Sequence, residues 1–278
     1  FVLSMIAGIS VTGLVLGSTA ILPERTEFQN RGSSSPFKSF ADVFRNPHAF
    51  LLLIVFGIET FGAATIGLLV PYLVDYVIPA EAMPFSKATY FTAILATYTI
   101  PQFAFTPIWI RIARYTGKKQ LWAFSMWLSS AIFVGYFFAL HEPLLIWLLS
   151  FLLGVTGGIS AVVAPSIQAD IIDYDEYLTG ERKEGSYLAV WNLIRKGAAS
   201  ITALVTGFTL QLSGFEPNVV QSEETQFALR ALFSLLPATC YFIGATLFIK
   251  FALNEAEHAR VRKVIDARPD VSQQRAEE

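Results

Sequence analysis

Seven long blocks of predominantly apolar residues recur along the chain of 278 residues, and they restrict it to few fold classes. A helix needs about 20 such residues to cross a hydrocarbon core about 30 Å thick. The blocks approach or exceed this length, and only 15% of the residues are charged, against about 25% in a soluble domain. We therefore predict an all-α membrane protein, with spans at 1–22, 48–76, 87–112, 120–140, 144–168, 185–212 and 227–251.

The polar segments between these blocks complete the predicted domain plan. Residues 23–47 form a cytoplasmic linker, in which Ser35 followed by Pro36 is typical of a helix start. Phenylalanines recur on one face after it, which predicts a short amphipathic helix at the membrane surface. Residues 252–278 carry mixed charges, and we expect a solvated, partly disordered cytoplasmic tail there.

The cations of the polar segments are divided unevenly between the two sides of the predicted membrane. The linker, the turn after the span at 87–112, the loop at 169–184 and the tail are rich in lysine and arginine, whereas the other side is nearly bare. By the positive-inside rule the cation-rich side is cytoplasmic. We expect a multi-pass protein of the cell's inner (plasma) membrane, with the N-terminus of the chain outside and its C-terminus inside.

The start of the chain predicts a piece of a longer protein. Phe1 is not an initiator Met, and residues 1–22 lack both a positive leader and a cleavage site. One span precedes the linker and six follow it, as expected when a protein of two six-helix halves is cut late in its first half. Such paired halves are a transporter architecture. We predict residues 1–22 as the last helix of an N-terminal half and residues 48–251 as a C-terminal six-helix bundle.

Two cations, Arg195 and Lys196, interrupt the apolar helix predicted at 185–212. An ionisable group near the bilayer centre costs roughly 3 kcal/mol on insertion scales, so it usually faces a polar cavity or a partner. Lys196 shares a face with Asn192, which predicts a substrate or cation cavity, and the alternative is a cation that snorkels to the interface. Arg195 is one turn from Trp191, so it either contacts substrate or forms a cation–π pair with that ring.

Glu59 is the one carboxylate well inside a predicted span. A buried carboxyl group can take up a proton, which would suit proton coupling. It can instead form a fixed ion pair with Lys196, with Arg195 or with a partner in the other half. Burial favours the neutral carboxyl and pairing favours the charged one, so both roles stay open.

Asp170 and Asp173 follow the span predicted at 144–168, at its C-terminal end, where the helix dipole disfavours negative charge. We expect cations of the cytoplasmic loops to compensate, the candidates being Arg111, Arg114, Arg182 and Lys183. Such a network could be broken and remade as a gate during alternating access. The alternative is a solvated charged loop, since exposed ion pairs contribute little.

The sequence lacks the patterns of several other functional classes. Three scattered histidines and one cysteine offer no metal-ligand spacing, and no nucleophile triad, phosphate loop or redox motif is present. No basic stripe indicates a nucleic-acid partner. Gly154 and Gly158 have a spacing that favours close helix packing over a ligand role. We therefore expect no enzyme, no catalytic residue, no metal site and no cofactor other than a coupling cation.

The most specific pattern of the chain is D-x-x-D-Y-x-E-Y-x-T-G-x-R-x-E-G at 170–185. It resembles the loop between the tenth and eleventh helices of the glycoside-pentoside-hexuronide:cation symporters, the melibiose-permease-like branch of the major facilitator superfamily. The Lys196-Gly197 pair, the basic turn at 111–119 and the segment at 214–222 are similar to that family too. On this alignment the chain corresponds to helices six to twelve of a twelve-helix major facilitator fold.

The resemblance implies a secondary transporter that binds substrate and coupling cation between its halves, with Lys196 at the border of both sites. It implies that the cation-binding carboxylates and most sugar contacts belong to the first half. Ala161, Trp191 and Asn192 depart from the sugar-transporting pattern, which leaves the substrate open.

We therefore predict sodium- or proton-coupled symport of a glycoside or related small solute by alternating access. The expected partners are this solute, the lipid bilayer and the N-terminal half of the same protein. A transporter of the same fold with a non-sugar or amphipathic substrate is one alternative, and a membrane-embedded enzyme is another.

Overall fold

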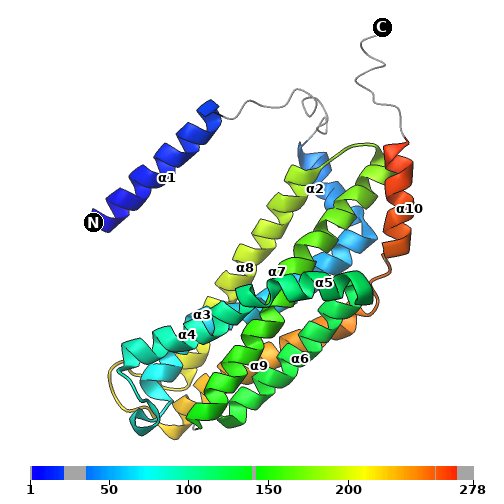
Figure 1. Cartoon of the computed structure of the whole chain (residues 1–278). Coiled ribbons are helices and arrows are strands. Elements are labelled where there is room, and N and C mark those ends of the chain that lie inside the picture. Colours follow the sequence, from blue (N-terminus) through cyan, green and yellow to red (C-terminus); the bar gives the residue numbers. More distant parts are fainter. Residues whose placement is uncertain (1, 22–35, 140–141, 254, 268–278) are drawn as a thin grey trace.

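The computed structural model describes residues 2–21, 36–139, 142–253 and 255–267, and every regular element within these ranges is helical (Figure 1). The predicted all-α class is confirmed. The elements are α1 (Val2–Ile21), α2 (Pro36–Arg45), α3 (Pro47–Tyr76), the 3-10 turn η2 (Ala80–Ala82), α4 (Lys87–Ala104), α5 (Thr106–Thr116), α6 (Lys118–Ala139), α7 (Pro143–Thr179), α8 (Glu184–Leu212), α9 (Glu223–Phe248) and α10 (Glu255–Asp266).

Four of the described helices, α3, α6, α7 and α9, are long and apolar enough to cross a membrane. The pair formed by α4 and α5 would make a fifth span, bent by 49° at its break. Helix α8 is not among them, since the charges of Arg195 and Lys196 lower its mean hydropathy. Helix α1 is not among them either, since its described apolar part, Met5–Ile21, is short. The chain is a multi-pass membrane protein, and the spans predicted at α1 and α8 stay predictions.

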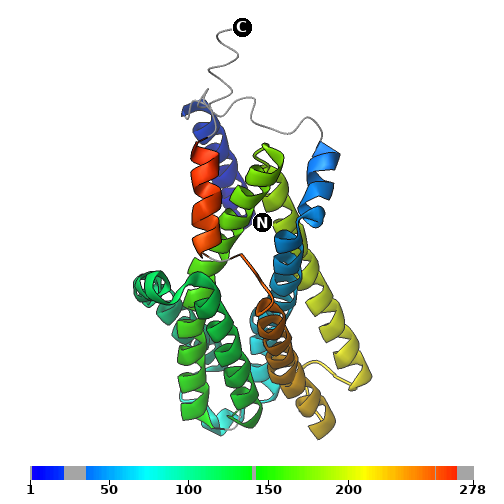
Figure 2. The same cartoon turned by 90° about the vertical axis from the view of Figure 1, so that its right-hand side faces the viewer.

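Helices α2 to α10 pack into a bundle, and α1 lies apart from it (Figure 1). Helix α3 lies against α8 and α9, α6 contacts both α7 and α9, and α4 lies along α7 (Figures 1 and 2). Aromatic rings join α6 to α9, since the centroids of Phe133 and Tyr241 are 5.6 Å apart and those of Trp122 and Phe248 are 4.8 Å apart. Such ring pairs combine large buried area with a preferred geometry, so they hold these two helices in register.

Two glycines of α7 let α4 approach it closely. A Cβ atom on Gly154 would lie 2.1 Å from the carbonyl oxygen of Tyr98, and one on Gly158 would lie 2.8 Å from that of Gln102. Both distances are below the 3.0 Å that real Cβ atoms keep from other heavy atoms. The packing role predicted from the glycine spacing is confirmed, and it brings Tyr98 and Gln102 next to α7.

The prolines of the span predicted at 87–112 divide it into α4 and α5. Pro107 lies in the first turn of α5 and has no N–H with which to continue the hydrogen bonds of α4. The Phe103 carbonyl therefore lacks its usual α-helical donor, and beside it the Thr106 hydroxyl donates to the Gln102 carbonyl at 2.8 Å. Helix α5 then departs from the axis of α4 and contacts α6 and α7.

Helix α7 extends beyond the span predicted at 144–168. It continues to Thr179 and ends at Gly180, which adopts the left-handed conformation with φ 73°. A helix of 37 residues is about 55 Å long, which exceeds the hydrocarbon core by several turns. Asp170 and Asp173 therefore lie within the helix, and their predicted place at its C-terminal end is wrong. The helix dipole acts mainly on the last turn, so it does not explain their need for cations.

Two short helices cover the end of the bundle that we predict to be cytoplasmic. Helix α2 begins at Pro36 and packs on α3 and α8, with Val43 fully buried. Helix α10 packs on α7, and its Val261 is 3% exposed. The expected disorder is wrong for residues 255–266, because an apolar contact and ion pairs attach this helix to the bundle, while most of its residues are exposed as expected.

Parts of the linker and tail predictions fall on residues 22–35 and 268–278, which lie outside the described residues. Helix α1 precedes the linker, and residues 5–21 of it are exposed apart from half-buried Gly17. The assignment of α1 to an N-terminal half stays a prediction.

Candidate functional site

A cavity of about 380 Å³ lies between the helices of the bundle. Its volume falls in the range of about 300–1,000 Å³ that is typical of sites for small molecules. Apolar side chains and a limited number of polar groups share its wall, as such sites require. The polar groups come from six helices and belong to Glu59, Thr60, Tyr98, Gln102, Ser129, Ser160, Gln168, Arg195 and Tyr241.

Glu59 lies near the middle of α3 and is 7% exposed. Its carboxylate accepts a hydrogen bond from Ser160 of α7, with 2.9 Å between Ser160 Oγ and Glu59 Oε1. Within the described part of the chain, no ion pair joins Glu59 to Arg195 or Lys196. Of the predicted roles of Glu59, this leaves proton uptake and a partner elsewhere in the protein.

Arg195 lies on α8 and contributes its side chain to the cavity wall. Its Cζ atom is 5.7 Å from the centroid of the Phe56 ring of α3, which is a cation–π distance. The predicted cation–π pair with Trp191 is wrong. Trp191 is 2% exposed, and its ring lies 5.7 Å from that of Tyr187, one turn nearer the N-terminus. Side chains of a helix lean toward its N-terminus, so the Trp191 ring packs onto the Tyr187 ring. The Arg195 guanidinium contacts the Phe56 ring instead.

Lys196 and Asn192 share a side of α8 that is exposed, and neither of them lines the cavity. The predicted site residues thus fall into three groups. Glu59 and Arg195 both line the cavity, Lys196 and Asn192 are exposed as Arg195 is but do not line it, and Trp191 is buried in packing. A role of Lys196 and Asn192 in binding stays a prediction.

None of the seven uncharged polar residues of the cavity was singled out from the sequence, and four of them, Tyr98, Gln102, Ser160 and Gln168, form two pairs. Tyr98 and Gln102 are one turn apart on α4, and Ser160 and Gln168 are about two turns apart on α7. Each pair therefore shares a helix face. A search for polar residues at helical spacing inside apolar spans would have found both pairs, whereas a search for charges passes over them.

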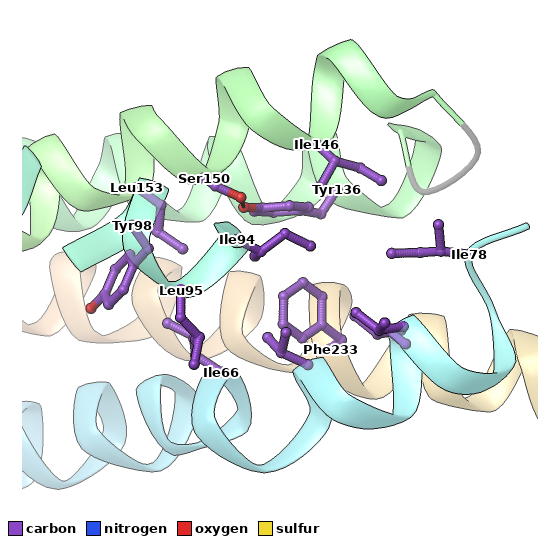
Figure 3. Close-up of a pocket in the computed structure, with 13 residues that line it drawn as sticks. Ile66, Ile78, Ile94, Leu95, Tyr98, Tyr136, Ile146, Ser150, Leu153 and Phe233 are labelled. Atoms are coloured by element: carbon purple, nitrogen blue, oxygen red, sulfur yellow. Dashed lines mark hydrogen bonds between the residues drawn. The ribbon is translucent and has the colours of Figure 1, made fainter. Parts of the chain in front are cut away.

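A small apolar pocket adjoins the cavity. It holds about 20 Å³, enough for about one water molecule, and it shares Tyr98 with the cavity. Figure 3 shows the Tyr98 ring at the edge of this pocket, with its hydroxyl turned away from Ile78 and Ile146. The Tyr136 and Ser150 hydroxyls hydrogen-bond each other at 2.7 Å, so the pocket offers a solute no unsatisfied polar group from this pair.

Asp170 and Asp173 of α7 receive cations from three segments. Lys118, at the start of α6, lies 2.6 Å from Asp170. Arg182, in the loop before α8, and Arg262 of α10 each lie 3.2 Å from Asp173. These ion pairs join α6, α10 and the loop before α8 to α7.

Helix α10 lies beside α7 (Figure 2) and makes further contacts with the same carboxylates. His258 Nε2 lies 3.1 Å from Asp173 Oδ2 and 3.6 Å from Asp170 Oδ1. Glu255 Oε1 accepts a hydrogen bond from the backbone N–H of Lys118 at 2.6 Å. The sequence reasoning missed this contribution, because a segment expected to be solvated was not considered as a partner.

Arg182 also pairs with Glu176 at 2.6 Å and with Glu184. Burial lowers the pKa of Arg182, but the hydrogen bonds and charges of Glu184 and Glu176 raise it above its ordinary value. Arg182 therefore stays charged at any physiological pH.

Arg111 and Arg114, predicted for the same network, are exposed and form no ion pair with the described residues. Both lie on α5, which departs from the axis of α4. Lys118 of the same basic turn takes the place next to Asp170. The role of all these residues as a gate stays a prediction.

Lys183 forms a second cluster of ion pairs, with 1% of its side chain exposed. Its Nζ atom lies 3.0 Å from Asp42 of α2 and 3.6 Å from both Asp175 and Glu181. Burial lowers the pKa of Lys183, but the hydrogen bond to Asp42 and the charge of Asp175 outweigh it and raise the pKa above its ordinary value. Lys183 thus attaches α2 to the bundle, and it does not pair with Asp170 or Asp173 as predicted.

Comparison with known proteins assigns the chain to a family, because residues 1–255 match the sequence profile of the MFS/sugar transport protein family. The chain belongs to this family. The predicted resemblance to the cation symporters of the major facilitator superfamily is thereby confirmed, and the family is one of transporters rather than enzymes.

Several relatives within this MFS sugar transport family support the same assignment. The chain is 27% identical to an uncharacterized symporter of Synechocystis sp., over 58% of the chain and 31% of the relative. It is 27% identical to a glucuronide carrier protein homolog of Escherichia coli, over 57% of the chain and 35% of the relative. It is 26% identical to a proposed sulfoquinovose importer of Escherichia coli, over 84% of the chain and 49% of the relative. The chain spans less than half the length of each of these relatives.

Proposed function

We propose that the protein is a secondary active transporter that moves a glycoside or related small solute together with sodium or a proton by alternating access. The observation that carries the proposal is a cavity inside a membrane bundle that holds Glu59 and Arg195 among uncharged polar groups. Ionisable groups inside a membrane mark substrate and ion pathways. The names of two relatives, a glucuronide carrier homolog and a sulfoquinovose importer, support a sugar derivative as the solute.

In this proposal the ion pairs at Asp170 and Asp173 act as a gate. They join three segments to α7 and would keep one side shut while the other is open. The distribution of cations supports a cytoplasmic position for this side, in the inner (plasma) membrane, with the C-terminus inside. The transporter would need no cofactor beyond the coupling cation, and its partners would be the solute, the bilayer and an N-terminal half.

Uptake by the full-length transporter in proteoliposomes tests the proposal. Accumulation of a 4-nitrophenyl glycoside under a sodium or a proton gradient, each imposed alone, is the expected result. Lys196→Ala should abolish this accumulation and leave membrane insertion intact, because the family resemblance implies that Lys196 borders both sites. Arg260→Gln, at an exposed position of α10, is the control and should accumulate the glycoside normally.

If neither gradient drives uptake of any glycoside, the sugar assignment is wrong, and the same uptake assay with non-sugar and amphipathic solutes would then apply. If Lys196→Ala still accumulates the solute, this residue has no part in coupling.

A further inference from the structure

A second cavity, of about 540 Å³, lies between α5 and α7, and it shares no residue with the cavity that holds Glu59 and Arg195. The start of α6 and the first residue of α10 complete its wall. We call it the α5–α7 cleft. Its wall includes Ile110 and Arg114 of α5, Lys118 of α6, Val162 and Ser166 of α7, and Glu255 of α10.

The cleft and the solute cavity lie on opposite faces of α7. Successive residues of an α-helix are about 100° apart, so side chains two positions apart point in nearly opposite directions. Ser160 and Ala164 line the solute cavity, whereas Val162 and Ser166, each two positions further along, line the cleft. The other half of a transporter lies across the solute cavity. The cleft therefore faces away from that half and toward the bilayer.

Helix α5 has the direction and the side chains of a helix at a membrane surface. It bends by 49° from the axis of α4 and crosses α7, whereas α4 runs along α7 (Figure 1). The Trp109 indole N–H donates to the Val155 carbonyl of α7 at 2.9 Å and fixes α5 there. On the outer side of α5, Ile108 and Ile110 are 48% and 40% exposed, and Arg114 is exposed beside them. Exposed apolar side chains next to a cation suit the boundary between acyl chains and phospholipid headgroups.

Arg114 is the charge of the cleft that has no partner among the described residues. The Lys118 ammonium pairs with Asp170 at 2.6 Å. Glu255 Oε1 accepts the backbone N–H of Lys118 at the N-terminus of α6, where the helix dipole favours a negative charge. The exposed Arg111 lies one turn before Arg114 on α5 and also forms no ion pair with the described residues. The cleft is therefore complementary to an anion.

The wall of the cleft offers both polar donors and an apolar side. The Arg114 guanidinium is a rigid fork of N–H donors that matches two oxygens of a phosphate. The Ser166 hydroxyl, on the α7 side, makes no hydrogen bond with the described residues and can donate to the same phosphate. Ile110 and Val162 provide apolar surface beside these donors.

We propose that the α5–α7 cleft binds an anionic phospholipid of the bilayer, with the lipid phosphate on Arg114 and an acyl chain along Ile110 and Val162. A soluble phosphate ester has the charge but no chain for the apolar side. A zwitterionic lipid would bring a second cation close to Arg114. The site faces away from the solute cavity, so the proposal does not depend on the solute or on its coupling.

The charge is tested by native mass spectrometry of the full-length transporter in detergent, which counts bound lipids. Dioleoylphosphatidylglycerol should bind the wild type with a Kd about tenfold lower than it binds Arg114→Gln. Arg114→Lys should keep part of the affinity, since it retains the charge but not the fork. Arg260→Gln, which removes an exposed cation of α10 outside the cleft, is the matched control and should bind like the wild type.

The shape of the cleft is tested with Ser166→Phe, which places a ring in the cleft and leaves all its charges. This variant should also weaken phosphatidylglycerol binding, by about tenfold. Unfolding temperatures in lipid-free detergent check that the variants fold. Arg114→Gln should match the wild type, since it removes no ion pair with the described residues.

Four outcomes would overturn the proposal. Equal affinity of the wild type and Arg114→Gln would mean that another part of the full-length protein fills the cleft. An equal loss in Arg114→Gln and Arg260→Gln would mean that binding follows the overall charge. Dioleoylphosphatidylcholine that binds as tightly as phosphatidylglycerol would rule out an anionic headgroup. Competition by glycerol 3-phosphate at the concentration of the lipid would indicate a site for a soluble phosphate ester.

Discussion

Lys183 Nζ lies 3.0 Å from Asp42 Oδ2, so a cation of the loop before α8 holds the short helix α2 against the bundle. Asp175 and Glu181 lie 3.6 Å from the same nitrogen atom. Because 1% of the Lys183 side chain is exposed, water contributes little to balancing its charge, which the carboxylates balance instead. One buried cation therefore attaches the end of the linker to the transporter bundle.

Replacement of Lys183 by methionine is expected to lower the free energy of unfolding by about 3 kcal/mol, because it leaves Asp175, whose side chain is 4% exposed, without its cation. Asp42 keeps an ion pair with Arg45 at 3.7 Å. Thermal unfolding of the purified transporter in detergent measures the effect. Lys263→Met, the same change at an exposed position of α10, is the control and should alter stability by less than about 0.5 kcal/mol. A Lys183→Met variant as stable as the wild type would mean that water replaces the cation.

The pKa of Lys183 sets the pH range over which this ion pair stabilises the fold. Burial lowers this pKa, but Asp42 and Asp175 raise it above its ordinary value of 10.5. A cation with a raised pKa stabilises the fold fully below its unfolded value and loses this contribution as the pH rises through the folded one. The stability difference between wild type and Lys183→Met should therefore persist from about pH 7 to about pH 9. A difference that collapsed within this range would contradict the raised pKa.

Asp173→Asn is expected to weaken the closure of the gate, because it removes the charge that Arg182 and Arg262 contact. A loss of about 1.4 kcal/mol would change the ratio of closed to open states tenfold. The measurement is labelling of a cysteine introduced at Thr116 with a membrane-impermeant reagent in inside-out vesicles. Labelling should increase in the variant, while solute affinity within each state hardly changes.

Arg260→Gln is the control for this experiment, since it removes an exposed charge of α10 and should label like the wild type. The native Cys240 is 7% exposed and should add little background. Unchanged labelling in Asp173→Asn together with reduced transport would show that the carboxylate is not part of a gate.

Gly154→Ala is expected to destabilise the protein by about 3 kcal/mol or more, because overpacking of this kind forces the backbone apart. The new Cβ atom would lie 2.1 Å from the Tyr98 carbonyl oxygen, which belongs to α4 and cannot rotate away. Gly67→Ala, on α3, is the matched change, since nothing lies within 4 Å of its Cβ position. It should be neutral or stabilise by up to about 1 kcal/mol. Equal unfolding temperatures for the two variants would disprove the close contact.

The sequence by itself determined the class and the family of this protein. Apolar blocks of about 20 residues match the thickness of a bilayer, and this property is local to each block. The charged pattern at 170–185 is likewise local, so the family could be recognised without a structure. The spacing of Gly154 and Gly158 predicted their packing for the same reason, because residues four apart share one face of a helix.

Only the tertiary structure decided which charged residues meet. Arg195 and Lys196 are neighbours in sequence, but a turn of about 100° separates them, and the rotation of α8 against α3 places only the first in the cavity. Lys118 reaches Asp170 in place of Arg111 because α5 departs from the axis of α4. Lys183 meets Asp42, which is 141 positions away, because the packing of α2 on α8 brings them together. Such contacts depend on the relative positions of whole helices, which the local spacing of residues does not encode.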